Sequence, residues 1–181
     1  KITVRGDAGD TAGHCSAGGK IYIGGRAGTR SGSLMKHDPL YEEPQLWVLK
    51  KCRFILPLNS LGGGKAVVCG IDSEEFASVL GERPCVGMVG GTVYFRGKID
   101  GYPADIRLKD LTDEDIAFLD NNMDEFLESI GRTELRSELS DWQQWHKLEP
   151  LTFAEKQAIA DKQPDIKSFR QNEWIKRWYV Q

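Results

Sequence analysis

Short apolar runs framed by glycines recur through the first hundred residues. Three of them begin with a Gly-Gly pair, continue with a short, mostly β-branched or aromatic run, and close at a glycine: residues 18–24, 63–70 and 90–97. Residues 1–6 fit the same pattern without the leading glycines. Runs of this length and composition are typical of strands, and glycine allows the positive φ angles of sharp turns. We therefore predict one parallel sheet that contains Ile2–Val4, Ile21–Ile23, Ala66–Val68 and Val93–Phe95.

The spacing of the runs predicts a repeating fold. From Lys1 to Lys20 is 19 residues, and from Gly63 to Gly90 is 27. The interval from Gly18 to Gly63 leaves room for an insertion near 37–44, and the interval from Gly63 to Gly90 leaves room for one near 72–80. The insertion near 72–80 has acidic residues before helically spaced apolar ones, which predicts a short helix. Strands at 46–49 and 54–58 would complete the middle repeat. Repeats that cannot bury their own apolar face stack on one another, so we predict an all-β solenoid, a short right-handed parallel β-helix, for residues 1–101.

The rest of the chain, residues 102–181, is predicted to be an α-helical tail that serves as an interaction segment. Of the 20 glycines, 19 lie at or before Gly101, so the composition changes sharply there. Thr112 followed by three acids is typical of a helix start, and apolar residues at three- and four-residue steps continue to Gly131, which can end the helix. Thr152 and Glu155 have capping-box spacing and predict a further helix start.

Charge and cysteine content narrow the classes of partner. The net charge of −3 and the pI of about 5.7 argue against a nucleic acid or an anionic membrane surface as the ligand. No apolar run is long enough to span a bilayer, so we expect no membrane partner. The four cysteines lie far apart without a CxxC pair, which favours reduced thiols and a cytoplasmic location.

None of the motifs that could carry chemistry is complete. His14 and Cys15, with Cys69 and Cys85 in later repeats, could supply metal ligands, but cysteines also fill narrow interiors. The glycines at 61–66 lack the spacing and the Ser or Thr of a phosphate loop. Asp7 and Asp10 are more typical of turns than of a catalytic carboxylate pair. We therefore predict no catalytic, cofactor-binding or metal-binding residue in this chain.

Two groups of apolar residues are candidates for contacts with a protein partner. The first lies in and beside the insertion at 37–44, and the second lies near the end of the chain. Aromatic residues in exposed segments are enriched at protein interfaces. The interface candidates are Leu40, Tyr41, Trp47, Trp174, Trp178 and Tyr179.

The glycine pattern resembles a known family. Residues 6–14 followed by 18–23, and later 81–94, are similar to the GXGXG β-helix at the C-terminal end of the glutamate synthase large subunit. That domain also occurs as a separate subunit of related enzymes. The segment 111–142 is similar to the helical region that follows the β-helix in glutamate synthase, so the resemblance covers about residues 1–150.

The resemblance implies a non-catalytic scaffold or assembly domain of a glutamate-synthase-type oxidoreductase, in glutamate biosynthesis and ammonia assimilation. It implies protein partners, namely FMN-containing synthase and glutamine amidotransferase domains or subunits. It implies no cofactor in this chain, with FMN and an iron–sulfur cluster placed in partner subunits. Two alternatives remain: a similar scaffold in a formylmethanofuran-dehydrogenase-type complex, whose coils are usually more regular and lack such a tail, and a stand-alone β-helix carbohydrate-active or binding protein.

Overall fold

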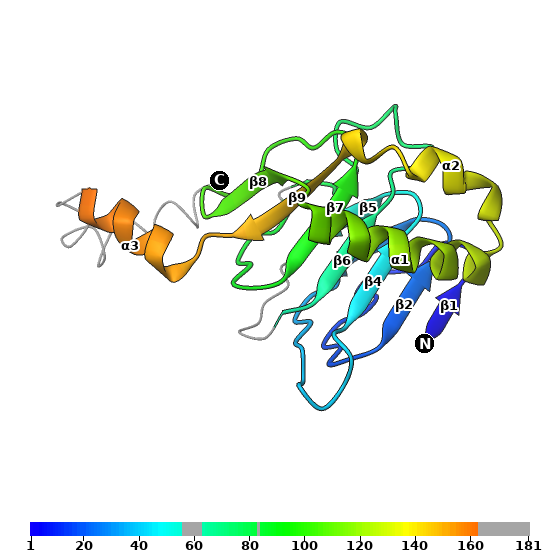
Figure 1. Ribbon diagram of the computed structural model, residues 1–181, viewed down its shortest axis with the longest axis horizontal. Helices are drawn as coiled ribbons and strands as arrows, with labels where there is room; N and C mark the ends of the chain where they lie inside the picture. The colour runs from blue at the N-terminus through cyan, green and yellow to red at the C-terminus, as the bar shows by residue number, and fades with distance from the viewer. Residues whose placement is uncertain (56–62, 83, 163–181) are drawn as a thin grey trace. The chain divides into compact units, whose positions relative to one another are not determined.

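A seven-stranded mixed sheet forms the centre of the unit Lys1–Pro150 (Figure 1). The computed structural model describes residues 1–55, 63–82 and 84–162, and the chain divides into this unit and Leu151–Gln181. The order across the sheet is β1-β2-β4-β6-β7-β9-β8, and β3 pairs with β5 in a separate two-stranded sheet. The strands are β1 (Ile2–Val4), β2 (Lys20–Ile23), β3 (Ala27–Ser31), β4 (Gln45–Val48), β5 (Cys52–Ile55), β6 (Lys65–Val68), β7 (Thr92–Arg96), β8 (Ile106–Asp110) and β9 (Trp145–Pro150). The helices of this unit are α1 (Asp113–Ile130) and α2 (Arg136–Leu139), with short 3-10 turns at Thr133–Leu135 and Trp142–Gln144.

The predicted parallel sheet is confirmed. Strands β1, β2, β4, β6 and β7 run parallel, and the four predicted runs lie in β1, β2, β6 and β7. The 19-residue spacing also holds beyond the strands. Ile2 pairs with Ile21, and Ala8 forms a bridge with Ala27. Residues 1–15 therefore lie in constant register beside the segment that follows.

The prediction of an all-β solenoid with an α-helical tail is wrong, because the fold is mixed α/β. Two strands come from the segment that was expected to be helical: β9 pairs antiparallel with β7, and β8 pairs antiparallel with β9. The backbone groups on the outer side of β7 need hydrogen-bond partners, and β9 supplies them. The predicted helix at 72–80 is also wrong, since these residues form turns. The predicted domain boundary after Gly101 stays a prediction.

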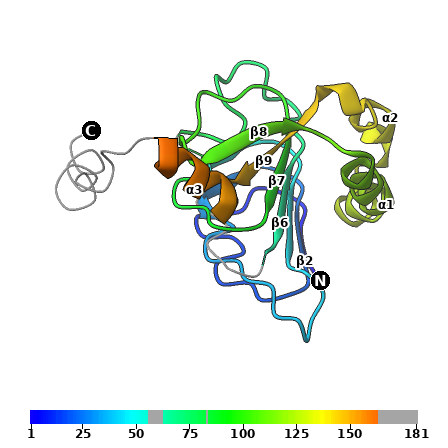
Figure 2. The ribbon, with the colours of Figure 1, turned by 60° about the vertical axis from the view of Figure 1, so that its left-hand side comes forward.

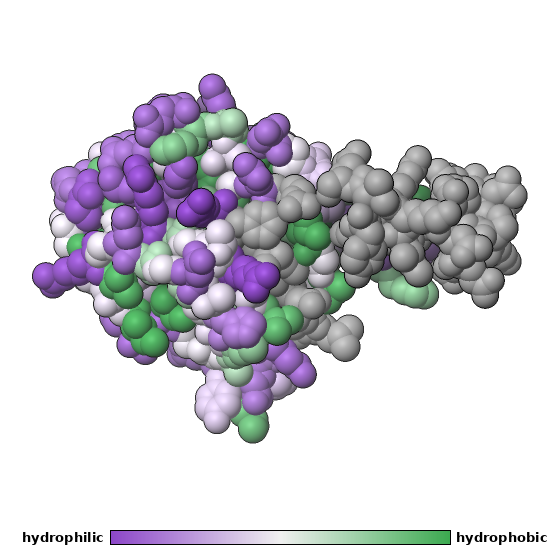
Figure 3. All heavy atoms as spheres, turned by 180° about the vertical axis from the view of Figure 1, so that it is seen from behind, coloured by the Kyte–Doolittle hydropathy of each residue, from purple (hydrophilic) through white to green (hydrophobic). Residues whose placement is uncertain are grey.

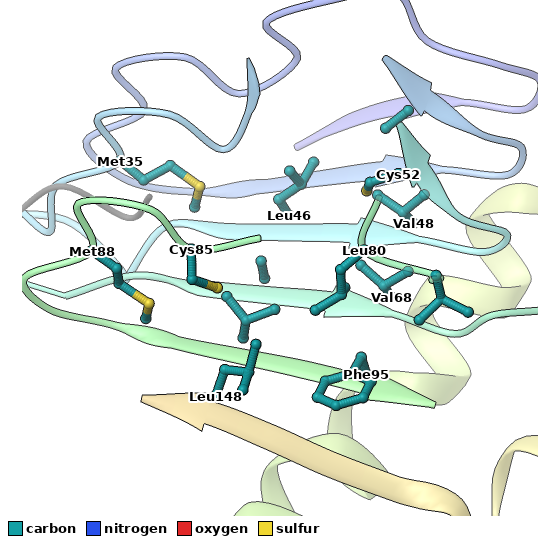
Figure 4. Close-up of a cluster of buried hydrophobic side chains, with 14 of the residues drawn as sticks. Met35, Leu46, Val48, Cys52, Val68, Leu80, Cys85, Met88, Phe95 and Leu148 are labelled. Atoms are coloured by element: carbon teal, nitrogen blue, oxygen red, sulfur yellow. The ribbon is translucent and has the colours of Figure 1, made fainter. Parts of the chain in front are cut away.

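Side chains along each strand alternate between the two faces of the sheet, and both faces are largely buried over the inner strands β2, β4, β6 and β7. Tyr22, Trp47, Val67 and Tyr94 pair in register and form one row that lies under α1. Their neighbours point to the other face, where turns and the β3–β5 sheet cover them. Figure 2 shows α1 on one side of the sheet and the loops on the other. The residues labelled on the loop face in Figure 4 are Met35, Leu46, Val48, Cys52, Val68, Leu80, Cys85, Met88, Phe95 and Leu148.

The predicted helix signals are confirmed at α1 and α3. Thr112 and Asp115 form a capping box, and Gly131 ends α1 with φ of 74°. In the unit Leu151–Gln181, α3 (Phe153–Lys162) begins with hydrogen bonds between Thr152 and Glu155, as the capping-box spacing predicts. Among the described residues, no helix has the length and apolarity that crossing a membrane requires.

Candidate protein-contact surface

The connection between β3 and β4, residues 32–44, presents apolar side chains on an ordered backbone. It begins at Gly32, whose φ of 74° turns the chain out of β3. Met35 then inserts into the loop-face core and is 1% exposed. At the far end, Glu43 pairs with Lys65 of β6 at 3.0 Å. The loop is therefore fixed at both ends while its centre projects from the unit (Figure 1).

Hydrogen bonds hold the centre of this loop in one conformation. The backbone N–H of His37 donates to Gly63 O at 3.0 Å, and that of Asp38 donates to Ala17 O at 3.1 Å. Asp38 Oδ1 accepts from the backbone N–H of Leu40 at 3.0 Å, and His37 Nε2 donates to Tyr41 O at 3.0 Å. Because two of these bonds join the loop to neighbouring segments of the same chain and two lie within it, the loop needs no partner to become ordered.

Gly18 allows the loop to approach the preceding turn closely. A Cβ atom built at Gly18 would lie 2.7 Å from Tyr41 Cβ and 3.0 Å from Glu42 O. Any larger residue at this position would push the loop away. The Gly-Gly pair before β2 therefore positions the loop as well as opening the strand.

The centre of the loop exposes two large side chains. Leu40 is 85% exposed and Tyr41 is 63% exposed, so the structure presents both of these interface candidates to solvent. Leu34, in the same loop, is 43% exposed. In Figure 3, which shows the unit from behind, hydrophobic side chains gather mainly in the lower half of the face, where this loop projects. Adjacent exposed apolar side chains on a fixed loop are typical of a protein contact.

Trp47 was predicted as a third member of this surface, and that prediction is wrong. It is 0% exposed and lies under α1, with its ring centroid 5.3 Å from that of Phe126. In β4 it points to the face opposite Leu46 and Val48, where the helix covers it. The candidates Trp174, Trp178 and Tyr179 lie outside the described residues.

The cysteines and His14 do not come together. Cys69 lies on the α1 face of the sheet, Cys52 and Cys85 lie on the loop face, and Cys15 is exposed. Burial raises the pKa of both Cys52 and Cys85 to about 12, so these thiols stay protonated. Across the described ranges, no group of three or more His, Cys, Asp or Glu side chains could hold a metal ion. His14 instead hydrogen-bonds Ser33 Oγ through Nδ1 at 2.7 Å.

The two N-terminal aspartates cap backbone groups of the adjacent repeat. Asp7 Oδ1 accepts from the backbone N–H of Arg26, and Asp10 Oδ1 accepts from that of Thr29, each at 2.6 Å and 19 residues away. The bond from Thr29 lowers the pKa of Asp10, so this carboxylate stays ionised. Both carboxylates are occupied by structural hydrogen bonds.

One largely buried polar cluster has perturbed pKa values, and the sequence analysis did not predict it. Asp115 accepts from Tyr94 Oη at 2.8 Å and pairs with Lys147 Nζ at 2.7 Å. Burial disfavours the charge on Asp115, but the hydrogen bonds from Lys147 and Thr112 outweigh it and lower the pKa. Burial likewise disfavours the charge on Lys147, whereas Asp115 and Glu149 raise its pKa. Both groups stay charged near neutral pH, and the cluster ties α1 to β7 and β9.

Sequence reasoning missed the strands that place Lys147 in this cluster. The signal was present, because Ile106–Asp110 and Trp145–Pro150 each alternate apolar and polar residues over part of their length. The helix signals that begin at Thr112, between these two strands, and at Thr152, after the second, hid that alternation.

Comparison with known proteins does not assign this chain to a family. No family model matches the sequence, and no curated protein matches it.

Proposed function

We propose that this chain is a non-catalytic scaffold or assembly subunit or domain of a glutamate-synthase-type oxidoreductase. Its contact with a partner runs through the loop of residues 32–44, and the reaction takes place in the partner. The observation that carries the proposal is the pair Leu40 and Tyr41, 85% and 63% exposed on a hydrogen-bonded backbone.

A fixed loop with apolar residues is well suited to binding. A partner that covers Leu40 and Tyr41 gains the hydrophobic free energy of two large side chains. Because His37 and Asp38 already order the loop, little conformational entropy is lost on association. Tyrosine is also one of the residue types enriched at interface hot spots.

The resemblance of residues 6–23, 81–94 and 111–142 to the glutamate synthase large subunit supplies the kind of partner. It points to an FMN-containing synthase domain, with a glutamine amidotransferase domain in the same assembly. Asp7, Asp10, Asp115 and His14 hydrogen-bond neighbouring groups of the fold, and three of the four cysteines are buried in its two cores, which agrees with chemistry that is carried out elsewhere.

The test is affinity purification of the tagged chain from its native cells. We expect the wild-type chain to bring down a protein with an oxidised-flavin absorbance spectrum and glutamine-dependent glutamate formation. The variant Leu40→Asp/Tyr41→Ala should lose at least about 90% of that flavin, because a carboxylate replaces the apolar anchor. Val89→Ser is the matched control, since Val89 is 50% exposed but lies outside the loop.

Three results would count against the proposal. Recovery of a molybdenum or tungsten enzyme in place of a flavoprotein would assign the scaffold to a formylmethanofuran-dehydrogenase-type complex. Equal flavin recovery with the double variant and with Val89→Ser would remove the loop from the interface. Turnover of glutamine, a keto acid or a glycan by the purified chain alone would show that it is a catalyst.

A further inference from the structure

The two-stranded sheet formed by β3 and β5 has one face in the core and one in solvent. Ala27 and Cys52 are in register, and both are buried in the loop-face core. Because side chains alternate along a strand, the residues on either side of this pair point outward. Three of these outward positions hold cations, which are Arg26, Lys51 and Arg53.

An irregularity in β3 adds a fourth cation to this face. The register between β3 and β5 shifts between Thr29 and Ser31, and Arg30 lies at the shift with φ of 60°. Such bulges redirect side chains, and Arg30 is exposed. Hydrogen bonds from Thr29 are the main cause that lowers the pKa of Asp10, and the charges of Arg53 and Arg30 add to it. We refer to four residues together as the basic patch: Arg26, Arg30, Lys51 and Arg53.

The cations of the basic patch lie close to one another. Lys51 Nζ lies 2.8 Å from the ring centroid of Phe76, and Arg26 Cζ lies 5.6 Å from the same centroid. Burial is the main cause that lowers the pKa of Lys51, and the positive charges of Arg26 and Arg53 add to it. Like charges at neighbouring positions of adjacent strands destabilise a sheet. The basic patch therefore costs stability, and a bound anion would relieve that cost.

Nearby acids neutralise the basic patch only in part. Asp7 and Asp10 each use one carboxylate oxygen to accept a backbone N–H at or just before β3. Glu75 acts on the patch through its charge. In the part of the chain that the structure describes, no carboxylate forms a salt bridge with any of the four cations. Cations on the large sheet are instead paired, as Lys65 is with Glu43.

We propose that the basic patch binds an acidic, extended segment of a partner protein. Aspartate and glutamate side chains would accept charge-assisted hydrogen bonds from the guanidinium groups and relieve the repulsion among them. A strand rises about 3.3 Å per residue, so Arg26 and Arg30 are about 13 Å apart along the chain, the length of about five extended residues. The net charge of −3 favours a short acidic segment over a nucleic acid, which binds to a broad basic surface. The patch shares no residue with the loop of residues 32–44, so it does not rest on the proposed function.

A labelled hexaglutamate peptide is the probe, and hexaglutamine is its uncharged control. Fluorescence anisotropy of each peptide is measured with the full chain at about 20 mM salt, where screening between exposed charges is weak. We expect hexaglutamate to bind and hexaglutamine not to bind. Raising the salt concentration to about 0.5 M should abolish the binding, because the contacts are electrostatic and exposed.

Two double variants with the same change in net charge locate the contact. Arg30→Gln/Arg53→Gln removes two exposed cations of the basic patch, and we expect hexaglutamate to bind at least about tenfold more weakly. Arg107→Gln/Lys109→Gln removes two cations from β8, in the other sheet, and should leave the affinity unchanged. If the first variant loses the native circular dichroism spectrum, Arg53→Gln alone takes its place.

Three results would overturn the proposal. In the first, hexaglutamate binds the wild-type chain no better than hexaglutamine does. In the second, both double variants weaken the binding equally, which would show an effect of net charge and not of the basic patch. In the third, a six-nucleotide single-stranded DNA binds more tightly than hexaglutamate and loses that binding in Arg30→Gln/Arg53→Gln, which would assign the patch to a nucleic acid.

Discussion

The two faces of the central sheet are buried in different ways. On one face, aromatic rings from the strands meet α1. Phe126 lies 5.3 Å from Trp47 and 5.4 Å from Tyr22, measured between ring centroids. On the other face, small and flexible side chains lie under tight turns (Figure 4), and several glycines there leave no room for a Cβ atom. Large side chains thus fill the face under α1, whereas on the other face neighbouring segments approach one another closely through their backbones.

The difference follows from what covers each face. A helix axis lies well above a sheet, so long side chains such as Trp47 must fill the space between them. Turns of the adjacent segments lie against one another directly, so an atom added where two backbones meet causes a clash. We therefore expect the helix face to be sensitive to loss of volume and the loop face to be sensitive to gain of volume.

The largest effect should come from emptying the helix face. Trp47→Ala removes a fully buried indole and should lower the free energy of unfolding by about 4 kcal/mol. Val68→Ala, on the opposite face of the neighbouring strand, removes far less volume and should cost about 2 kcal/mol. Urea denaturation followed by circular dichroism measures both. Equal losses would contradict the difference in packing that we describe.

The ion pair that ties α1 to the sheet should rank second. Asp115→Asn keeps the shape of the side chain but leaves Lys147 without its closest opposite charge, at a site where both side chains are about 10% exposed. We expect a loss of about 3 kcal/mol in the free energy of unfolding. Glu114→Gln, which changes an exposed acid in the same helical turn, is the control and should be close to neutral. A comparable loss in both variants would show that the helix start, and not the pair, is responsible.

The loop face should be damaged by a single added methyl group. A Cβ atom at Gly25 would lie 2.1 Å from Asp7 Oδ1 and 2.7 Å from a backbone carbon of Gly6, so Gly25→Ala should cost about 2 kcal/mol. Gly6→Ala is the matched control, because a Cβ atom there has no neighbour within 4 Å. Thermal unfolding of the two variants compares them directly. If Gly25→Ala is as stable as Gly6→Ala, the close approach is not a constraint.

The smallest effect should appear in acid, where the C-terminal half of α1 meets β2. The hydrogen bond from Lys20 lowers the pKa of Glu125 to about 2, from an ordinary value of 4.5. Because the folded-state pKa is the lower one, Glu125 stabilises the fold fully above pH 4.5, and this contribution disappears as the pH falls toward 2. The effect is small because the side chain is 40% exposed.

Melting temperatures measured between neutral and acidic pH test this expectation. Glu125→Gln should show a shallower decline over that window than the wild-type chain. An unchanged profile in the variant would mean that other carboxylates set the acid sensitivity.

Part of this structure follows from local sequence rules. The Gly-framed runs predicted the parallel strands, and the interval of 19 residues between the first two runs matches the register in which Ile2 pairs with Ile21. Thr112 and Gly131 marked the two ends of α1. These features depend on neighbouring residues, because strand alternation, helix capping and positive φ are properties of short segments. Leu40 and Tyr41 were also found in this way, since an exposed loop places few demands on distant residues.

The sequence by itself therefore determined the four Gly-framed parallel strands, the two ends of α1 and the start of α3. Only the tertiary structure decided which face each strand residue occupies, that β9 returns to pair with β7, and that Trp47 lies beneath α1. It alone brought Asp115 to Lys147. The physical reason is that these outcomes depend on which distant backbone groups and apolar surfaces remain unpaired after the local elements have formed. The sequence of one segment does not show which distant segment will pack over it.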